Sequence, residues 1–206
     1  MKKIAILGST GSVGVQALEI IFNQKKHYVE YLYADSNYKL LYEQVLRFNP
    51  PYVCINNEVS YQKLIELIQN TSNIGTEVIL GVDNSIQFIS SKKVDLIINA
   101  IVGTDGLRPT IAAINNNIDI ALSNKESLVL AGKIVMEKSK KNNIKIFPVD
   151  SEHSAVWQCL RGEDMEDVNK IILTASGGPF RTLDIKCFHE ISVEDALNHP
   201  NWEMGS

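Results

Sequence analysis

Short apolar runs and amphipathic segments alternate from the N-terminus to Asp150. Short apolar runs are typical of strands buried on both faces of a sheet, whereas apolar residues recurring every three or four positions are typical of helices with one buried face. The pattern predicts seven strands, at residues 3–7, 29–34, 52–55, 78–80, 94–98, 118–122 and 144–149. It predicts helices between them, through residues 17–22 and at 38–48, 60–69, 85–90, 106–116 and 125–140.

Strand and helix alternate at steps of roughly 20–25 residues, as in parallel strands joined by right-handed helical crossovers. The sequence therefore predicts an α/β fold with a doubly wound, mostly parallel, Rossmann-like sheet. The composition changes after Asp150. There the sequence predicts a helix at 155–160, a strand at 171–174 and a helix at 193–198, separated by polar or glycine-containing turns.

A glycine-rich segment, GSTGSVG at residues 8–14, lies between the first strand and the first helix. In this context glycines let the backbone approach a pyrophosphate, and free amides at the helix start donate to it. The hydroxyls of Ser9, Thr10 and Ser12 can add donors. The spacing is G-x-x-G-x-x-G rather than the commoner G-x-G-x-x-G, so a tight turn that binds no ligand is the alternative.

Polar residues also follow four other predicted strands. Because the carboxyl ends of parallel strands meet at one edge of a sheet, we expect these residues to converge with the glycine-rich segment. They are Asp35-Ser36-Asn37, Asn99-Ala100, Ser123-Asn124-Lys125-Glu126 and Asp150–His153. An acid such as Asp35 after the second strand is typical of NAD sites, whereas Ser36 and Asn37 suit the 2′-phosphate of NADP, so these residues leave the choice open.

Asp150 and Glu152 follow the last predicted strand. In extended chain, residues two apart point to the same side, so the two carboxylates would repel each other unless a cation lay between them. Hard divalent ions such as Mg²⁺ or Mn²⁺ prefer oxygen ligands of this kind. The alternative is that Asp150 starts a turn and that Ser151 or Ser154 caps a helix.

Two further segments near the C-terminal end have polar or aromatic residues beside glycine. Ser176 precedes two glycines and could cradle a phosphate through its hydroxyl and neighbouring amides, or belong to a flexible turn. Trp202 lies between proline and glycine residues, in a loop able to close over a ligand; a tryptophan packed into a core is the alternative.

Charge and cysteine content exclude several classes of protein. The net charge of −4 gives no reason to expect a nucleic-acid or membrane partner. No apolar run approaches the roughly 18 residues that a membrane span needs, and the N-terminus has no signal-peptide pattern. The three cysteines are scattered without a CxxC pair, which indicates neither a disulfide framework nor a zinc site. We expect a cytoplasmic protein.

Five motifs together resemble the 1-deoxy-D-xylulose 5-phosphate reductoisomerase family, whose members are NADPH- and metal-dependent enzymes of non-mevalonate isoprenoid biosynthesis. They are GSTGSVG (8–14), SNKESLV (123–129), PVDSEHSA (148–155), SGGPF (176–180) and HPNWEMG (199–205). They occur in the family's order and near its spacing. The resemblance implies an NADPH-binding domain at residues 1–150 and the beginning of an α+β catalytic domain at 151–206.

The resemblance also implies roles for individual residues. Cofactor binding is implied for Gly8, Thr10, Gly11, Ser12, Val13, Ser36, Asn37, Asn124 and Glu126. Substrate binding is implied for Lys125, Ser151, Glu152, Ser176, His199 and Trp202, the last on a mobile lid. Asp150 and Glu152 would be two of three carboxylate ligands of Mg²⁺, Mn²⁺ or Co²⁺, and with Lys125 they form the implied catalytic set.

The implied reaction rearranges 1-deoxy-D-xylulose 5-phosphate to a branched aldehyde, which NADPH reduces to 2-C-methyl-D-erythritol 4-phosphate. The sequence departs from the family at Asp35, where glycine is usual. It also stops before the segment that carries the third metal ligand, so we expect NADPH binding with little or no turnover from this chain. The resemblance further implies a homodimeric parent, bacterial or plastid in origin.

Two other functions are compatible with a dinucleotide-binding sheet. One is a different NAD(P)-dependent sugar-phosphate or semialdehyde dehydrogenase, which would be indifferent to chelators. The other is a non-catalytic dinucleotide-binding module, which would not respond to a divalent ion. Neither requires the motifs at 148–155 and 199–205.

Overall fold

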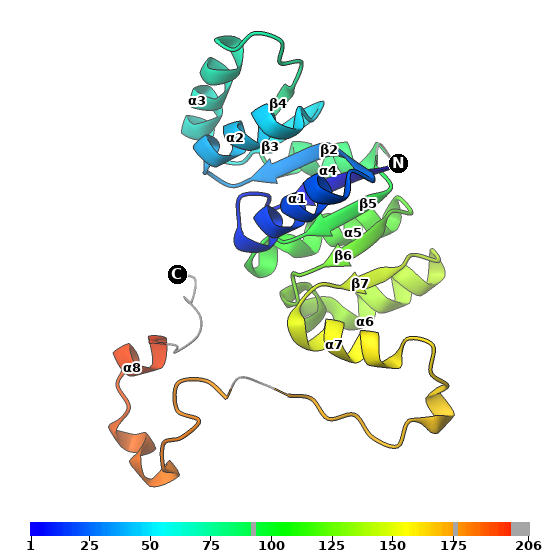
Figure 1. Cartoon of the computed structure of the whole chain (residues 1–206), viewed down its shortest axis with the longest axis vertical. Helices are drawn as coiled ribbons and strands as arrows, with labels where there is room; N and C mark the ends of the chain where they lie inside the picture. Colours follow the sequence, from blue (N-terminus) through cyan, green and yellow to red (C-terminus); the bar gives the residue numbers. More distant parts are fainter. Residues whose placement is uncertain (92–93, 175–176, 199–206) are drawn as a thin grey trace. The chain divides into compact units, whose positions relative to one another are not determined.

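The computed structural model describes residues 1–91, 94–174 and 177–198 (Figure 1). The chain divides into two compact units, Met1–Ser154 and Ala155–Ser206. Within the described ranges, no helix is long and apolar enough to cross a membrane.

The first unit is built on a seven-stranded parallel sheet with the order β4-β3-β2-β1-β5-β6-β7. Its strands are β1 (Lys2–Leu7), β2 (His27–Ala34), β3 (Tyr52–Ile55), β4 (Glu77–Leu80), β5 (Leu96–Asn99), β6 (Asp119–Leu122) and β7 (Ile146–Pro148). Its helices are α1 (Ser12–Gln24), α2 (Tyr38–Phe48), α3 (Glu58–Gln69), α4 (Val82–Ser90), the 3₁₀ turn η1 (Gly103–Gly106), α5 (Leu107–Asn115) and α6 (Glu126–Lys141). The predicted α/β, doubly wound, Rossmann-like sheet is confirmed.

Each face of the sheet has its own apolar core. Helices α1, α2 and α3 supply one core, and α4, α5 and α6 supply the other. Strand β1 belongs to both, because Ile4 and Ile6 point into the first core while Ala5 and Leu7 point into the second. This two-sided burial explains why β1 is a continuous apolar run rather than an alternating one.

The order of the strands reverses direction between β1 and β5. From β1 the chain adds strands outward to β4, and then α4 carries it back to β5 on the other side of β1 (Figure 1). The loops that follow β1 and β5 therefore leave toward opposite faces of the sheet. Such a switch point opens a crevice beyond the carboxyl ends of the strands, which is where doubly wound sheets bind ligands.

The second unit contains short elements. Helix α7 (Ser151–Leu160) leads into it, followed by the 3₁₀ turns η2 (Met165–Asp167) and η3 (Ile185–Glu190) and by α8 (Val193–Leu197). Ser192 and Asp195 form a capping box at the start of α8. In the described part of this unit, these elements contribute no buried residue.

Two expectations about this region were wrong. Residues 171–174 form no strand, and their apolar side chains are exposed, Ile172 at 72%. A strand needs a neighbour to accept its hydrogen bonds, and β propensity alone does not supply one. Helix α7 begins at Ser151, four residues before the predicted start, and the Ser154 amide donates to the Asp150 carbonyl at 3.0 Å. The helix therefore starts inside the motif that was expected to be extended.

Gly14 provides a test of how closely α1 packs on the glycine-rich segment. A methyl group at Gly14 would lie 2.2 Å from the Gly8 carbonyl oxygen, whereas one at Gly132 in α6 would meet its nearest neighbour at 4.0 Å. We expect Gly14→Ala to lower the free energy of unfolding by about 2–3 kcal/mol because the backbone must move apart. Gly132→Ala meets no such clash, and because Gly132 follows the kink of α6 at Ala131, it should change this free energy by less than about 1 kcal/mol.

Urea unfolding followed by circular dichroism measures both changes. Equal effects of the two substitutions would contradict the close packing at Gly14.

Candidate functional site

The sequence motifs begin at the same level on neighbouring strands. Leu7 pairs with Asn99, Asn99 pairs with Leu122, and Leu122 pairs with Pro148. Gly8 and Ser123 follow this row directly, Asn99 belongs to it, and Asp150 lies two residues after it. Adjacent strands are about 4.8 Å apart, so the row from β1 to β7 spans roughly 14 Å. The expected convergence of these loops at one edge of the sheet is therefore present.

The glycine-rich segment is anchored to β2 through its backbone. The amides of Gly8 and Ser9 both donate to the Tyr33 carbonyl at 2.9 Å. Gly8 has a φ of +83°, and a methyl group there would lie 2.6 Å from the Ala100 carbonyl oxygen. The segment therefore contacts the loop after β5 directly, and only glycine has both the conformation and the size for this position.

The start of α1 has the features of an anion site. Gly11 is its N-cap and has no side chain to accept from the first amides, and the described first turn contains no acidic residue. The amides of Ser12, Val13 and Gly14 precede the first intrahelical bond, which Val15 donates to Gly11 at 2.9 Å. These donors and the positive end of the helix dipole favour a phosphate.

Gly11 differs from the other two glycines of the motif. It is exposed, and a methyl group there would meet only the Gly8 carbonyl oxygen, at an ordinary 3.4 Å. Packing within the chain therefore does not require glycine at this position. Close approach of a ligand to the backbone is a sufficient reason for it, and a dinucleotide pyrophosphate fits the donor set.

The residues after β2 are exposed and partly engaged with neighbours. Asn56 Nδ2 donates to the Asp35 carboxylate at 3.0 Å, which directs that carboxylate toward the end of β3. Asn37 Oδ1 accepts from the Leu40 amide at 3.2 Å and caps α2. The Ser36 hydroxyl and the Asn37 Nδ2 group thus lie at the rim as neutral donors.

A buried amide network, centred on Asn99 and Asn124, was not predicted. Asn99 Nδ2 donates to the Gly106 carbonyl and to Thr110 Oγ1, both at 2.9 Å. Asn124 Nδ2 donates to the carbonyls of Ile101 and Gly103 at 2.7 Å. The network holds the loop after β5 against the loop after β6.

The Asn124 side chain is fully engaged within the protein. It is 2% exposed, its Oδ1 accepts from the Ser127 amide and hydroxyl, and its Nδ2 also reaches Glu126 Oε2 at 3.1 Å. The side chain therefore holds Glu126 and the start of α6 in place. A methyl group at Gly106 would lie 2.4 Å from it, so this contact also requires a glycine. Lys125 is exposed beside it.

Asp150 lies between β7 and α7 with its side chain only 12% exposed. His153 Nδ1 lies 2.8 and 2.7 Å from its two carboxylate oxygens and must be the donor, because an ionised carboxylate only accepts. His153 itself is 61% exposed. The histidine therefore orients the carboxylate at the same edge as the glycine-rich segment.

The backbone at the predicted metal ligands does not have the extended conformation that was expected. Glu152 belongs to the first turn of α7, so the extended-chain argument for a shared side of Asp150 and Glu152 does not hold. Among the described residues, no group of three or more His, Cys, Asp or Glu side chains could hold a metal ion. The two carboxylates have the right chemistry for Mg²⁺ or Mn²⁺, and their role as ligands stays a prediction.

Two ionisable groups near the ends of β2 and β3 are neutral at ordinary pH. Burial, with smaller contributions from Cys54 and Asp35, raises the pKa of Tyr33 well above its usual range. Burial raises the pKa of the Cys54 thiol to about 11. Neither group is a nucleophile or a general base in this state.

Ser176, His199 and Trp202, which were predicted to bind substrate, lie outside the described residues. The other predicted site residues, from Gly8 to Glu152, all belong to the first unit.

Comparison with known proteins identifies relatives along the whole chain. The family model described as 1-deoxy-D-xylulose 5-phosphate reductoisomerase matches residues 4–132, and the model of that enzyme's C-terminal domain matches residues 146–206. The reductoisomerase of Geotalea uraniireducens is 48% identical over all of this chain and 53% of its own length. That of Lachnoclostridium phytofermentans is 45% identical over all of this chain and 52% of its own length. The chain spans about half the length of these curated relatives.

Solved structures of such enzymes have the same fold. A reductoisomerase in complex with NADPH, fosmidomycin and magnesium is 35% identical, with a TM-score of 0.86 over all of this chain and 52% of that chain. The Zymomonas mobilis enzyme in complex with NADPH is 34% identical, with a TM-score of 0.88 over 97% of this chain and 52% of that chain.

Asn124→Asp tests the buried amide network. The substitution preserves shape but removes the donors to Ile101 and Gly103 and places a charge against their carbonyls. We expect the free energy of unfolding in urea to fall by about 2–4 kcal/mol. Asn84→Asp is the matched control, since Asn84 Nδ2 also donates to a carbonyl, that of Leu80 at 2.8 Å, but at an exposed position; its cost should stay near 0.5 kcal/mol. A small effect at Asn124 would contradict the network.

Proposed function

The chain belongs to the 1-deoxy-D-xylulose 5-phosphate reductoisomerase family, and on that basis we propose that it supplies the NADPH-binding part and two metal ligands of this enzyme. The proposed reaction rearranges 1-deoxy-D-xylulose 5-phosphate and reduces the product to 2-C-methyl-D-erythritol 4-phosphate. Residues 1–150 form the proposed cofactor domain and residues 151–206 the start of the catalytic domain. Cytoplasmic location and a homodimeric parent are part of the same proposal.

The observation that carries the proposal is the uncapped start of α1 at the switch point of the sheet. Its free amides are those of Ser12, Val13 and Gly14, because the Gly11 amide donates to the Gly8 carbonyl at 3.1 Å. Together with Thr10 and the exposed backbone of Gly11, they would bind the pyrophosphate of NADPH. Gly8 brings this segment against the loop after β5. When bound, NADPH supplies the hydride for the reduction. The relatives solved with NADPH support the choice of cofactor.

Lys125 and Glu126 extend the proposed site along the sheet edge. Asn124 donates to the Glu126 carboxylate, and Lys125 is the N-cap of α6, so a cation and an anion lie side by side at the start of this helix. We assign Lys125 to the substrate and Glu126 to the cofactor. Lys125 can bind an anionic or developing negative oxygen of the substrate.

Asp150 and Glu152 would hold Mg²⁺ or Mn²⁺, with Co²⁺ as a further option. A divalent ion polarises a carbonyl and stabilises alkoxide charge when bound. His153 holds the Asp150 carboxylate in one orientation, which reduces the conformational entropy that this side chain would lose on binding a metal ion. The Ser151 hydroxyl would bind the substrate. Ser176 and His199 would bind its phosphate end, and Trp202 would close over it.

The end of β2 sets the choice between NADPH and NADH. Ser36 and Asn37 supply neutral donors to a 2′-phosphate, whereas the Asp35 carboxylate repels it and suits a free ribose hydroxyl. Asn56 holds the Asp35 carboxylate toward β3, which favours contact of the 2′-phosphate with Ser36 and Asn37 rather than with Asp35. We therefore propose NADPH as the cofactor despite Asp35.

Calorimetry with NADPH and NADH tests this proposal. We expect the chain to bind NADPH more tightly than NADH. Asp35→Asn should raise the affinity for NADPH about fivefold, the size expected when a nearby like charge is removed in water-like surroundings. NADH affinity should not rise.

Glu43→Gln serves as the control, because Glu43 is an exposed carboxylate on α2 outside the proposed site. Failure of the chain to bind either dinucleotide would refute the proposed function.

The metal ligands are tested by Mn²⁺ titration monitored by electron paramagnetic resonance. Asp150→Asn should weaken Mn²⁺ binding at least about tenfold, since a neutral amide replaces an anionic ligand. Asp167→Asn, at an exposed carboxylate of η2, should leave binding unchanged. Mn²⁺ binding that is indifferent to Asp150→Asn would favour a metal-independent dehydrogenase or a dinucleotide-binding module.

A further inference from the structure

We propose that Gln44 of α2 is a positioning residue of the cofactor site, which fixes the Ser9–Thr10 peptide so that the Thr10 amide faces the pyrophosphate. The inference depends on the proposed dinucleotide-binding function and adds to it a residue outside the glycine-rich motif.

Gln44 occupies a core position of its helix. The buried residues of α2 are Leu41, Gln44 and Val45, spaced as the apolar stripe of an amphipathic helix. Gln44 is 5% exposed. A buried amide costs free energy unless it is hydrogen bonded, so a glutamine in this stripe needs a polar partner.

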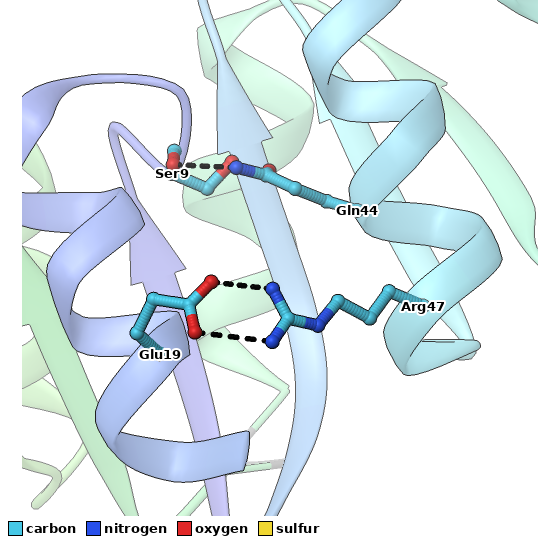
Figure 2. A network of polar contacts seen from close by, with 4 residues as sticks. All are labelled: Ser9, Glu19, Gln44 and Arg47. Carbon is cyan, nitrogen blue, oxygen red and sulfur yellow. Dashed lines mark hydrogen bonds and ion pairs between the residues drawn. The ribbon is translucent and has the colours of Figure 1, made fainter. Parts of the chain in front are cut away.

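The partner of Gln44 is the backbone of the glycine-rich segment. Gln44 Nε2 donates to the Ser9 carbonyl oxygen at 2.8 Å, across 35 positions in the sequence (Figure 2). The Ser9 amide donates to the Tyr33 carbonyl at 2.9 Å. The peptide groups on both sides of Ser9 are therefore fixed, one by β2 and the other by α2.

The planarity of the peptide bond determines what this contact does. In a trans peptide the carbonyl and the following N–H point in opposite directions, and the described chain contains no cis peptide. Because Gln44 draws the Ser9 carbonyl toward α2, the Thr10 N–H must point away from α2. Without Gln44, rotation about the two flanking single bonds lets this peptide turn over and withdraws the donor.

A second contact of α2 makes it possible to distinguish a positioning role of Gln44 from a general role in holding α2 in place. Arg47, one turn after Gln44, makes a two-pronged ion pair with Glu19 of α1 (Figure 2). Its guanidinium also lies 4.0 Å from the centre of the Phe22 ring. This pair joins α2 to α1 at the surface, whereas Gln44 joins α2 to the glycine-rich segment that precedes α1. Arg47→Met is therefore the matched control.

The test measures binding of two ligands to the 206-residue chain by calorimetry. NADP⁺ contains the pyrophosphate, and adenosine 2′-monophosphate lacks it. We expect Gln44→Met, which keeps the length but removes the donor, to weaken NADP⁺ binding about tenfold, as for one misplaced hydrogen bond to a charged group. Adenosine 2′-monophosphate should bind as it does to the wild-type chain. Arg47→Met should lower stability and leave both affinities unchanged.

Gln44→Glu supplies the conservative variant. Its neutral acid form can donate O–H to the Ser9 carbonyl, whereas its ionised form cannot. NADP⁺ binding by this variant, relative to wild type, should therefore recover as the pH falls through the pKa of the new carboxyl group. Gln44→Met should show no such recovery.

Three outcomes would overturn the inference. Wild-type NADP⁺ affinity in Gln44→Met would exclude a positioning role. Equal losses for the two ligands would indicate general damage to the site rather than a misdirected donor. A wild-type chain that binds no NADP⁺ would refute the proposed function and this inference with it.

Discussion

The structure depends on a backbone junction between β1, α1 and the loop after β5. Gly8 lies against Ala100, and Gly14 lies against Gly8, at distances that leave no room for a side chain at either glycine. The junction is possible because β1 is central in the sheet and the strand order reverses beside it. It brings the start of α1, with its free amides, to the crevice between the two halves of the sheet.

Buried amide side chains hold the loops around this junction. Gln44 holds the glycine-rich segment, Asn99 holds η1, and Asn124 holds the loop after β5. Each donates to backbone carbonyls from a different element. A neutral amide can satisfy a buried carbonyl without the desolvation cost of a buried charge, which makes it suitable for holding loops beside an anionic ligand. Lys125, which follows Asn124 directly, is thereby placed on a fixed backbone.

The two units differ in how their elements are held. The first has an apolar core on each face of the sheet. The described elements of the second contribute no buried residue. Asp150 to His153 belong to the first unit, so their geometry is set by β7 and its neighbours. His153, rather than a second carboxylate, is the side chain that contacts Asp150 most directly.

The sequence by itself determined the sheet, its strands and the level at which the motifs meet. Helix α2 was predicted with its observed bounds, Tyr38–Phe48, because its apolar spacing and its capping residue Asn37 are local features. The segments from Gly8 to Gly14 and from Asp150 to Glu152 could be proposed as site candidates from the sequence because strand ends and glycine turns are local features as well. Local patterns are sufficient where burial on one face selects the backbone conformation.

Only the tertiary structure decided which polar groups pair. Gln44 and Ser9 are 35 positions apart, and Asn124 and Ile101 are 23 apart, so periodicity could not connect them. Residues 171–174 have strand propensity but form no strand, because a strand exists only with a partner. Asp150 and Glu152 were expected in extended chain, yet α7 starts between them. Which residues distant in the sequence become hydrogen-bond partners, and where α7 begins, is decided only in the folded backbone.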